Sequence, residues 1–496
     1  MKRPVLNREL EELATGKVGR LLVKYSWPAL IAMSLNALYA VVDRVFIGQG
    51  CGVDAMAGIQ LAMPVMMLFG AFGVFIGAGH SAVLSIKLGE GDRTTCEKLV
   101  GQLVAYKLAF FFVLPPLVFF NLDTVLGWCG ADKVTPGAYV AAKEYLRLVL
   151  FSHLFSHLAF GLSALQRAEG GAIRSMLCMI VGFGVNLVLD PLLIFGFNLD
   201  FSPLFNLQPS TLNLAVRPLG IAGAAWATNI AMFLSCVWAL GYYLRGKTAV
   251  RLKWRRIGFY RGLLLKPAAI GLAPFLQQLM SSLIVAALAY QFAVWMPDEA
   301  SRTDQIASLG VFNSALILVF MPMLGAQQGL QPILGYNWGA RNFRRVLGTL
   351  KTGLGVTTGL CLFAWVVQVV PPFPKWISMM FVSSDNPRLI GICAHDLALS
   401  NCMIWCISLN VVATTYFQSI GKPAVSIVLS MLRQGVVLLP IILLLPRFLD
   451  DKAFAIWLSM PVSDVICNVV TILPLYLHAR FLAQVREKNS KTITAE

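Results

Sequence analysis

Twelve mostly apolar stretches follow one another along this chain of 496 residues, and each is long enough to cross a lipid bilayer as a helix. They centre near residues 36, 70, 110, 152, 185, 231, 280, 319, 360, 405, 435 and 466. A hydrocarbon core of about 30 Å needs about 20 apolar residues per helix. The stretches are continuously apolar instead of alternating, which favours helices over a β-barrel. We therefore predict an all-α integral membrane protein with twelve transmembrane helices.

The composition excludes several other classes of protein. Charged residues make up 13% of the chain, against about 25% in an ordinary soluble domain. The ten cysteines lie mostly in apolar stretches and form no CxxC pair, so we expect neither a disulfide framework nor a metal site, and no cofactor. The first twenty residues are polar and the apolar run after them is too long for a cleavable signal peptide.

The net charge of +16 comes from basic residues that gather on one side of the predicted membrane. Lys and Arg concentrate in the N-terminal tail, in residues 245–266 and in the C-terminal tail. This bias follows the positive-inside rule, so we expect both termini in the cytoplasm. The basic stretch 245–266 should lie against anionic lipid headgroups, and we expect no nucleic-acid partner.

That basic stretch divides the chain into two similar halves. Residues 76–93 (IGAGHSAVLSIKLGEGDR) align with residues 324–341 (LGAQQGLQPILGYNWGAR), which sets Gly91 opposite Gly339. A duplication with six helices in each half makes the halves parallel repeats, an arrangement common in transporters.

The repeats predict two lobes around a central cavity. Residues 167–172 align more weakly with residues 418–423, which extends the duplication toward the end of each half. The expected boundaries are an N-lobe at 1–244, a linker at 245–266, a C-lobe at 267–478 and a tail at 479–496.

Two of the apolar stretches contain aspartates where water should be scarce. Asp43 lies about fifteen residues after Pro28, and Asp190 lies within residues 185–197 (VNLVLDPLLIFGF). A charged group at the bilayer centre costs about 2.5–3.5 kcal/mol on insertion scales, so both carboxyls are candidate functional groups. Structural alternatives remain open, because Asp43 could pair with Arg44 and Asp190 could cap an interfacial loop.

Asn186 and Asp190 are four residues apart, which places an amide and a carboxylate on one helix face. Pro191 frees a backbone carbonyl about one turn earlier. Such an oxygen-rich group suits a proton or a hard cation such as Na⁺. A carboxyl in apolar surroundings can bind and release a proton near neutral pH. These residues are therefore candidates for a cation-coupling site.

Four motifs, in this order, carry a resemblance to a known family: PALIAMSLNALYAVVDRVFIGQ, NLVLDPLLIFG, QPILGYNWGA and LSMLRQGVVLLP. Together they resemble the multidrug and toxic compound extrusion (MATE) transporters, and best the branch with DinF- and MepA-type exporters. The resemblance runs from Pro28 to about Asp464. It implies a secondary active antiporter instead of an enzyme.

The resemblance also implies roles for individual residues. Asp43 matches an aspartate whose protonation is thought to bend the first helix at its proline, here Pro28. Asn36 falls at the polar position between them. The other matches to the family's cation site are Asn186, Asp190 and Thr228. The chain departs from the family at Ser163 and Ala164, where relatives often have asparagine.

The second half offers fewer acids, so we expect coupling to depend on the N-lobe. Arg433 and Asp464 could form an interhelical pair or contact substrate. His153 and His157 are spaced like metal ligands, but without a third ligand they favour ordinary polar contacts. The residues expected to line a substrate cavity are Tyr39, Met66, Phe69, Gln278 and Arg433.

The predicted function is export of amphipathic, often cationic, organic compounds in exchange for H⁺ or Na⁺. Aromatic faces attract organic cations, and methionines adapt to varied shapes. No Walker motif is present, so ATP should not power the protein directly. We expect small-molecule substrates, membrane lipids as partners, and a monomer in the bacterial inner membrane.

Two alternatives differ in function. A flippase or exporter of a lipid-linked or peptide metabolite belongs to the wider superfamily. A membrane-embedded lipid-modifying enzyme would use Asp43 and Asp190 with Mg²⁺, but the chain lacks a DDxxD cluster and the duplication has no role in such an enzyme.

Overall fold

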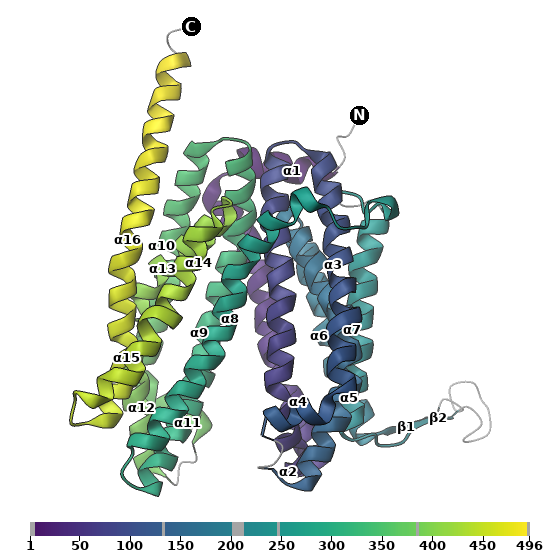
Figure 1. Ribbon diagram of the computed structural model, residues 1–496, viewed down its shortest axis with the longest axis vertical. Helices are drawn as coiled ribbons and strands as arrows, with labels where there is room; N and C mark the ends of the chain where they lie inside the picture. The colour runs from purple at the N-terminus through teal and green to yellow at the C-terminus, as the bar shows by residue number, and fades with distance from the viewer. Residues whose placement is uncertain (1–4, 131–133, 201–212, 246–248, 383–385, 494–496) are drawn as a thin grey trace.

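The structure is a computed structural model that describes residues 5–130, 134–200, 213–245, 249–382 and 386–493. Long helices run along the molecule and form two bundles side by side (Figure 1). Helix α1 and the last turns of α16 lie at one end, which we call the terminus end. The fold class predicted from the apolar stretches is confirmed.

The N-lobe contains the helices and strands before the linker. They are α1 (Val5–Thr15), α2 (Val18–Gly89), α3 (Arg93–Phe120), α4 (Leu122–Trp128), α5 (Pro136–Ala168), α6 (Ala172–Phe195), β1 (Phe197–Asp200), β2 (Asn213–Val216) and α7 (Ile221–Leu244). Strands β1 and β2 form a short antiparallel ribbon with Phe197 opposite Val216, a small addition to the expected all-α fold.

The C-lobe follows two short 3₁₀ turns, Trp254–Arg256 and Arg261–Leu263. Its elements are α8 (Leu265–Trp295), α9 (Glu299–Gly339), α10 (Phe343–Val369), α11 (Phe373–Phe381), α12 (Pro387–Ser400), η5 (Ile404–Cys406), α13 (Ile407–Ser419), α14 (Pro423–Met431), the π-helical η6 (Leu432–Leu438), α15 (Leu439–Leu444), η7 (Leu445–Arg447) and α16 (Lys452–Ile493).

Helix α2 is two consecutive membrane helices joined at a kink. Gly52 adopts φ 80° and ψ −171°, a backbone conformation that favours glycine, and it separates residues 18–51 from the span Asp54–Gly89. Within the described residues, eleven segments are long and apolar enough to cross a membrane. The first half of α2, which contains Arg20, Lys24 and Asp43, is the additional helix of the sequence prediction.

The two halves repeat the same turns. Gly89 ends α2 and Gly339 ends α9, and in each case a polar residue, Asp92 or Asn342, caps the next helix through its side chain. Gly89 therefore corresponds to Gly339, so the alignment that paired Gly91 with Gly339 was out of step by two residues. The weaker alignment holds, because Gly170 and Gly421 occupy the same left-handed position after α5 and α13.

Glycines let the lobes touch at the terminus end. A Cβ on Gly89 would collide with the Tyr336 carbonyl of α9, and a Cβ on Gly339 would collide with the Ile86 carbonyl of α2. The two collisions are reciprocal, as expected at a contact between repeats. Gln331 Nε2 also donates to Ser81 Oγ across this contact at 2.9 Å.

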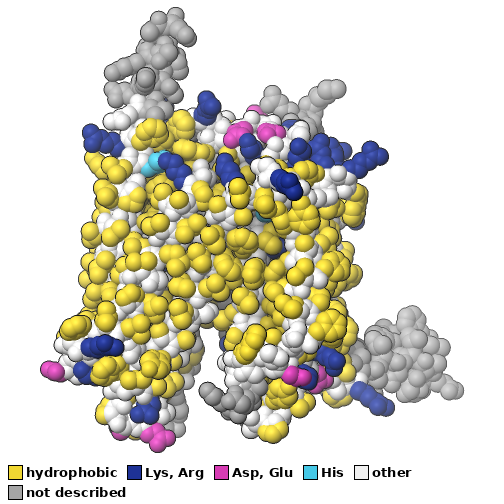
Figure 2. Space-filling view, viewed as in Figure 1, with side chains coloured by type: hydrophobic (Ala, Val, Ile, Leu, Met, Phe, Trp, Pro, Cys, Tyr) yellow, Lys and Arg dark blue, Asp and Glu magenta, His cyan; other side chains and the backbone are white. Residues whose placement is uncertain are grey.

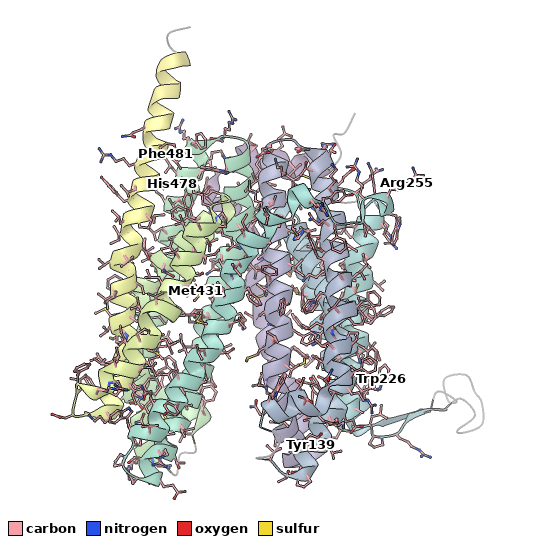
Figure 3. All side chains as sticks on the ribbon, in the orientation of Figure 1. Tyr139, Trp226, Arg255, Met431, His478 and Phe481 are labelled. Carbon is pink, nitrogen blue, oxygen red and sulfur yellow. The ribbon has the colours of Figure 1, made fainter. Side chains whose placement is uncertain are left out.

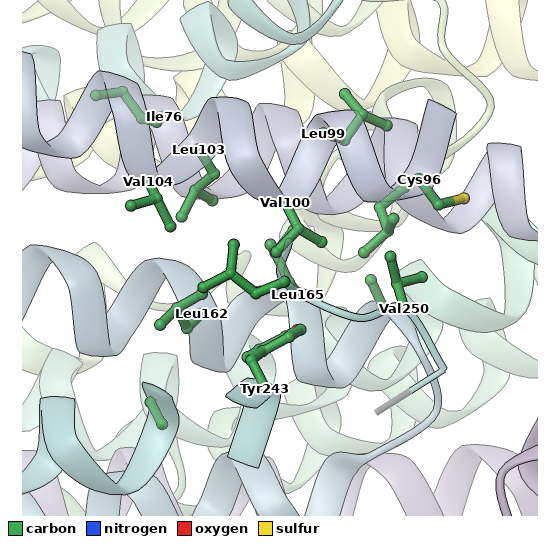
Figure 4. Packing of buried hydrophobic residues seen from close by; sticks show 14 of the residues in the cluster. Ile76, Cys96, Leu99, Val100, Leu103, Val104, Leu162, Leu165, Tyr243 and Val250 are labelled. Atoms are coloured by element: carbon green, nitrogen blue, oxygen red, sulfur yellow. The ribbon is translucent and has the colours of Figure 1, made fainter. Parts of the chain in front are cut away.

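At the opposite end the lobes separate. The space-filling surface is continuous between the lobes near the terminus end and hollowed between them at the other end (Figure 2). Inside the N-lobe, apolar side chains of α3, α5 and α7 pack together, among them Leu103, Leu162 and Tyr243 (Figure 4). The structure thus consists of two lobes that are closed together at one end and separated at the other.

Candidate functional site

One face of the first half of α2 carries the predicted polar residues. Asn36, Tyr39 and Asp43 are spaced by three and four residues, so they share a face of the helix. The Tyr39 ring stacks on Phe183 of α6, with ring centroids 5.4 Å apart and an interplanar angle of 16°. This contact turns the face toward the interior of the N-lobe.

Asp43 and Asp190 meet inside the N-lobe. Their carboxyl groups lie within hydrogen-bonding range of each other. Asp190 and Asn186 are fully buried on α6, and Asn186 Nδ2 donates to Asp190 Oδ1 at 3.1 Å. The same Nδ2 lies 3.4 Å from Thr228 Oγ1 on α7. Four residues expected from the sequence to act together therefore form one cluster.

The cluster has more oxygen acceptors than donors. Asp43 Oδ1, Asn186 Oδ1 and Asp190 Oδ2 are buried without a hydrogen-bond partner. An ionised carboxylate can only accept hydrogen bonds, so two carboxyls in contact need a proton between them. Unpaired buried oxygens are costly, and a bound cation relieves that cost. The donor set therefore fits a proton or a small hard cation.

Two tyrosines complete the cluster. The Tyr39 hydroxyl hydrogen-bonds with that of Thr228. Tyr145 of α5 is buried and lies close enough to both carboxyls to interact with them electrostatically. Sequence reasoning did not single out Tyr145. The available signal was a phenol within an apolar stretch, and it is a weak one because buried tyrosines are common.

Neither structural alternative describes the contacts that the two aspartates make. Asp190 lies within helix α6, so it does not cap a loop. Arg44 is exposed and its guanidinium points toward Met63 Sδ, 4.0 Å away, whereas the Asp43 carboxyl faces Asp190. Pro28 is buried within α2, whose backbone stays helical there.

The residues predicted to line a substrate cavity do not lie together. Phe69 is fully buried, with its ring stacked on His153 at 4.5 Å, so in this conformation it packs in the N-lobe core. Met66 packs partly buried against the same core. Gln278 of α8 is exposed. The prediction of these positions used residue type, which does not determine which face of a helix points toward a cavity.

Arg433 forms the interhelical pair that the sequence suggested. Its Nε donates to Asp464 Oδ1 of α16 at 2.9 Å, and both side chains are largely buried. The guanidinium also lies 5.9 Å from the centre of the Phe320 ring. Met431, labelled in Figure 3, lies two residues earlier at the middle of the C-lobe. Within the described residues, no group of three or more His, Cys, Asp or Glu side chains is placed to hold a metal ion.

Comparisons with known proteins agree with this arrangement. A family model described as MatE matches residues 28–192 and 279–444, more than half of the chain. The multidrug export protein MepA of Staphylococcus aureus (strain MRSA252) is 22% identical over 465 residues, covering 93% of this chain and 94% of that protein. MepA of Staphylococcus haemolyticus (strain JCSC1435) is 21% identical and covers 92% of each chain.

Solved structures share the fold. A structure of the MATE multidrug transporter DinF-BH is 29% identical, with a TM-score of 0.78, and the match covers 92% of this chain and 95% of that one. A MATE crystal structure in the bent conformation is 20% identical, with a TM-score of 0.83, covering 96% of this chain and 98% of that one.

Proposed function

Because the chain belongs to the MatE family of membrane transporters, we propose that it is a secondary antiporter that exports amphipathic organic cations in exchange for H⁺. The observation that carries the proposal is the buried contact between the carboxyls of Asp43 and Asp190. A pair of this kind binds one proton when the second carboxyl is ionised and releases it when the pair is exposed or separated.

The donor set favours H⁺ over Na⁺ as the coupling ion. A hard metal ion needs several oxygen ligands arranged around it. The cluster offers two carboxyls, the Asn186 amide oxygen and hydroxyls that already bond to each other. Ser163 instead hydrogen-bonds with Ser175 at 2.6 Å, about three turns before Asn186 along α6. A proton needs only the two carboxyls. Na⁺ is the alternative coupling ion, and the experiment must distinguish it from H⁺.

Beside the carboxyl pair lies a group of side chains suited to organic cations. Tyr39 and Phe183 stack, and they pack with four further residues of the N-lobe, Phe160, Met176, Met179 and Met232. Aromatic faces attract cations and methionines adapt to irregular shapes. The relatives named as multidrug export proteins support a substrate class of this kind.

The transport cycle follows from the shape of the molecule. We place the terminus end in the cytoplasm, because Lys and Arg gather mainly there (Figure 2), and we place the chain in the bacterial inner membrane as a monomer with contacts to lipid. In the conformation described, a proton from outside reaches the carboxyl pair while the cytoplasmic end is closed. The proposed N-lobe is residues 1–244, the linker is residues 245–266 and the C-lobe is residues 267–478.

The test is uptake of a fluorescent organic cation, ethidium, by vesicles containing the purified protein. An imposed pH gradient should drive ethidium against its gradient, and an imposed Na⁺ gradient at equal pH on both sides should not. Transport driven by the Na⁺ gradient alone would show that the coupling ion is Na⁺ instead of H⁺. Transport indifferent to both gradients would contradict antiport.

A further inference from the structure

A cluster of basic side chains lies inside the N-lobe, apart from the two aspartates. Lys107 of α3 is 1% exposed in the middle of an apolar span, and its Nζ donates to the Gly73 carbonyl of α2 at 2.7 Å. Around it are His80 of α2 and His153 and His157 of α5, all buried. Three of the five histidines of the chain thus lie in one cluster with this buried lysine.

The backbone makes room for these groups. A Cβ on Gly161 would lie 3.2 Å from Lys107 Cε, and a Cβ on Gly73 would lie 3.3 Å from His157 Nε2. Both positions lie within helices, where glycine is less favourable than alanine. Because glycine occupies both points of closest approach, the backbone leaves room for the Lys107 amine and the His157 imidazole.

Aromatic rings surround the cluster on the other sides. The His157 ring stacks on Phe110 at 5.0 Å, the His153 ring stacks on Phe69 at 4.5 Å, and the two histidine rings are 5.4 Å apart. His80 Nδ1 bonds with the Ile76 carbonyl at 2.8 Å, while its Nε2 and His153 Nε2 are buried without a partner. Nitrogen atoms able to take up a proton are therefore present and unused.

Within the described residues, no carboxylate is recorded as interacting with Lys107 or with these histidines. The titratable groups that face Lys107 are basic ones from α2 and α5, and the nearby phenol is Tyr106 of α3, whose ring lies 5.7 Å from that of His80. An unpaired charge in this position costs several kcal/mol. The number of protons that the cluster holds must then depend on its surroundings.

The C-lobe has no such cluster at the corresponding positions. The correspondence of Gly89 with Gly339 sets Lys107 opposite Thr357 and His80 opposite Leu330, both buried. The correspondence of Gly170 with Gly421 sets His157 opposite Ser408, which accepts a hydrogen bond from Thr358. One repeat therefore packs with neutral side chains where the other has basic ones, so the fold does not require the basic cluster.

We propose that Lys107, His80, His153 and His157 form a second proton-binding site of the N-lobe, loaded and unloaded once in each transport cycle. The proton adds to the lone pair of a neutral amine or imidazole, and no other bond forms or breaks. Helix α2 links the site to the lobe contact, because it carries both the Gly73 carbonyl and Gly89. The use of this proton in coupling rests on the proposed antiport function.

The first test measures the number of protons moved per ethidium. Vesicles are held at zero membrane potential, a pH gradient is imposed, and the ethidium gradient that stops net flux is found for each protein. Lys107→Met should lower the ethidium ratio at zero flux by about tenfold per pH unit, because one proton fewer is exchanged. The matched control is Lys351→Met, because Lys351 is exposed on α10, the counterpart of α3.

An unchanged ratio in Lys107→Met, with wild-type transport still following the pH gradient, overturns the second site alone. Wild-type transport that ignores the pH gradient contradicts the antiport function instead. NMR titration of the ¹⁵N-labelled histidines tests the binding site without a transport measurement. The buried rings should titrate together in wild-type protein, with a midpoint that shifts in Lys107→Met. Ring signals that are the same in both proteins at every pH overturn the site.

Discussion

Asp43 and Asp190 approach each other from two different helices, and their carboxyls lie within hydrogen-bonding range in the interior of the N-lobe. The contact joins the first half of α2 to α6, so it connects the helix that touches the C-lobe to the core of its own lobe. Under the proposed function, a change in protonation of the pair should therefore act on the position of that first helix.

Asp43→Asn should insert normally and lose ethidium efflux driven by a pH gradient. Without one coupled proton the protein loses about 1.4 kcal/mol per pH unit, equivalent to a substrate gradient of about tenfold. The measurement is ethidium accumulation in vesicles. Asp54→Asn is the matched control, because Asp54 is exposed and accepts a hydrogen bond from Thr135 at 2.7 Å outside the site. Full activity of Asp43→Asn would remove Asp43 from coupling.

Asp190→Asn should weaken the pH dependence of transport more than it weakens ethidium binding. The amide keeps the size of the side chain but cannot ionise, while the aromatic group around Tyr39 and Phe183 stays in place. Fluorescence titration gives the ethidium Kd, and transport at several pH values gives the pH profile. Equal effects on Kd and on the pH profile would contradict this division of roles.

Gly339→Ala should prevent the lobes from closing at the terminus end. The added methyl would collide with the Ile86 carbonyl of α2, a backbone atom that cannot turn aside. We expect the distance between spin labels placed on the two lobes at this end to increase, and transport to slow by at least about tenfold. Gly348→Ala is the control, because open space surrounds Gly348. An unchanged label distance would contradict the role of Gly339.

Asp464→Asn should destabilise the C-lobe, because it leaves the buried Arg433 guanidinium without its partner. Breaking a buried ion pair costs about 3–5 kcal/mol, whereas replacing both partners by apolar residues is often close to neutral. The melting temperature should therefore fall in Asp464→Asn and recover in Arg433→Met combined with Asp464→Leu. A loss of ethidium affinity without a loss of stability would assign the arginine to substrate binding.

Glu169→Gln should remove a pH dependence of stability. Glu169 lies just beyond the α5 span and is buried, and it accepts hydrogen bonds from Tyr243 Oη at 2.9 Å and from the Ala249 N–H of the linker at 2.8 Å. Burial raises the pKa of this carboxyl from 4.5 to about 8. The folded protein then binds a proton that the unfolded chain releases between these values, so stability falls as pH rises through this window.

The measurement for Glu169 is the melting temperature at pH 6, 7.5 and 9, chosen to span the raised pKa of about 8. Wild-type protein should lose several degrees across this range, and Glu169→Gln should lose less, because its amide is neutral throughout. Parallel dependence of the melting temperature on pH in the two proteins would show that the folded glutamate is already ionised at all three values and would contradict the raised pKa.

Several features of the site were predictable from residue type and spacing alone. Carboxyls are rare in apolar stretches, so Asp43 and Asp190 stood out, and the spacing of Asn186 and Asp190 placed them on one face. The partner of Arg433 was predictable for the same reason, since a buried cation needs an acid. Phe69 was not, because a phenylalanine in an apolar helix suits a core and a cavity equally well.

The sequence by itself determined which segments cross the membrane and that the chain contains two repeats. Each of these depends on short stretches of chain, since transfer of a helix into lipid is decided by its own residues. Tertiary structure alone decided that Asp43 faces Asp190, that Tyr145 joins them, that Lys107 lies among three histidines, and that Gly89 pairs with Gly339. These contacts depend on how each helix is rotated about its axis and packed against its neighbours, and the residues of one helix do not specify that rotation.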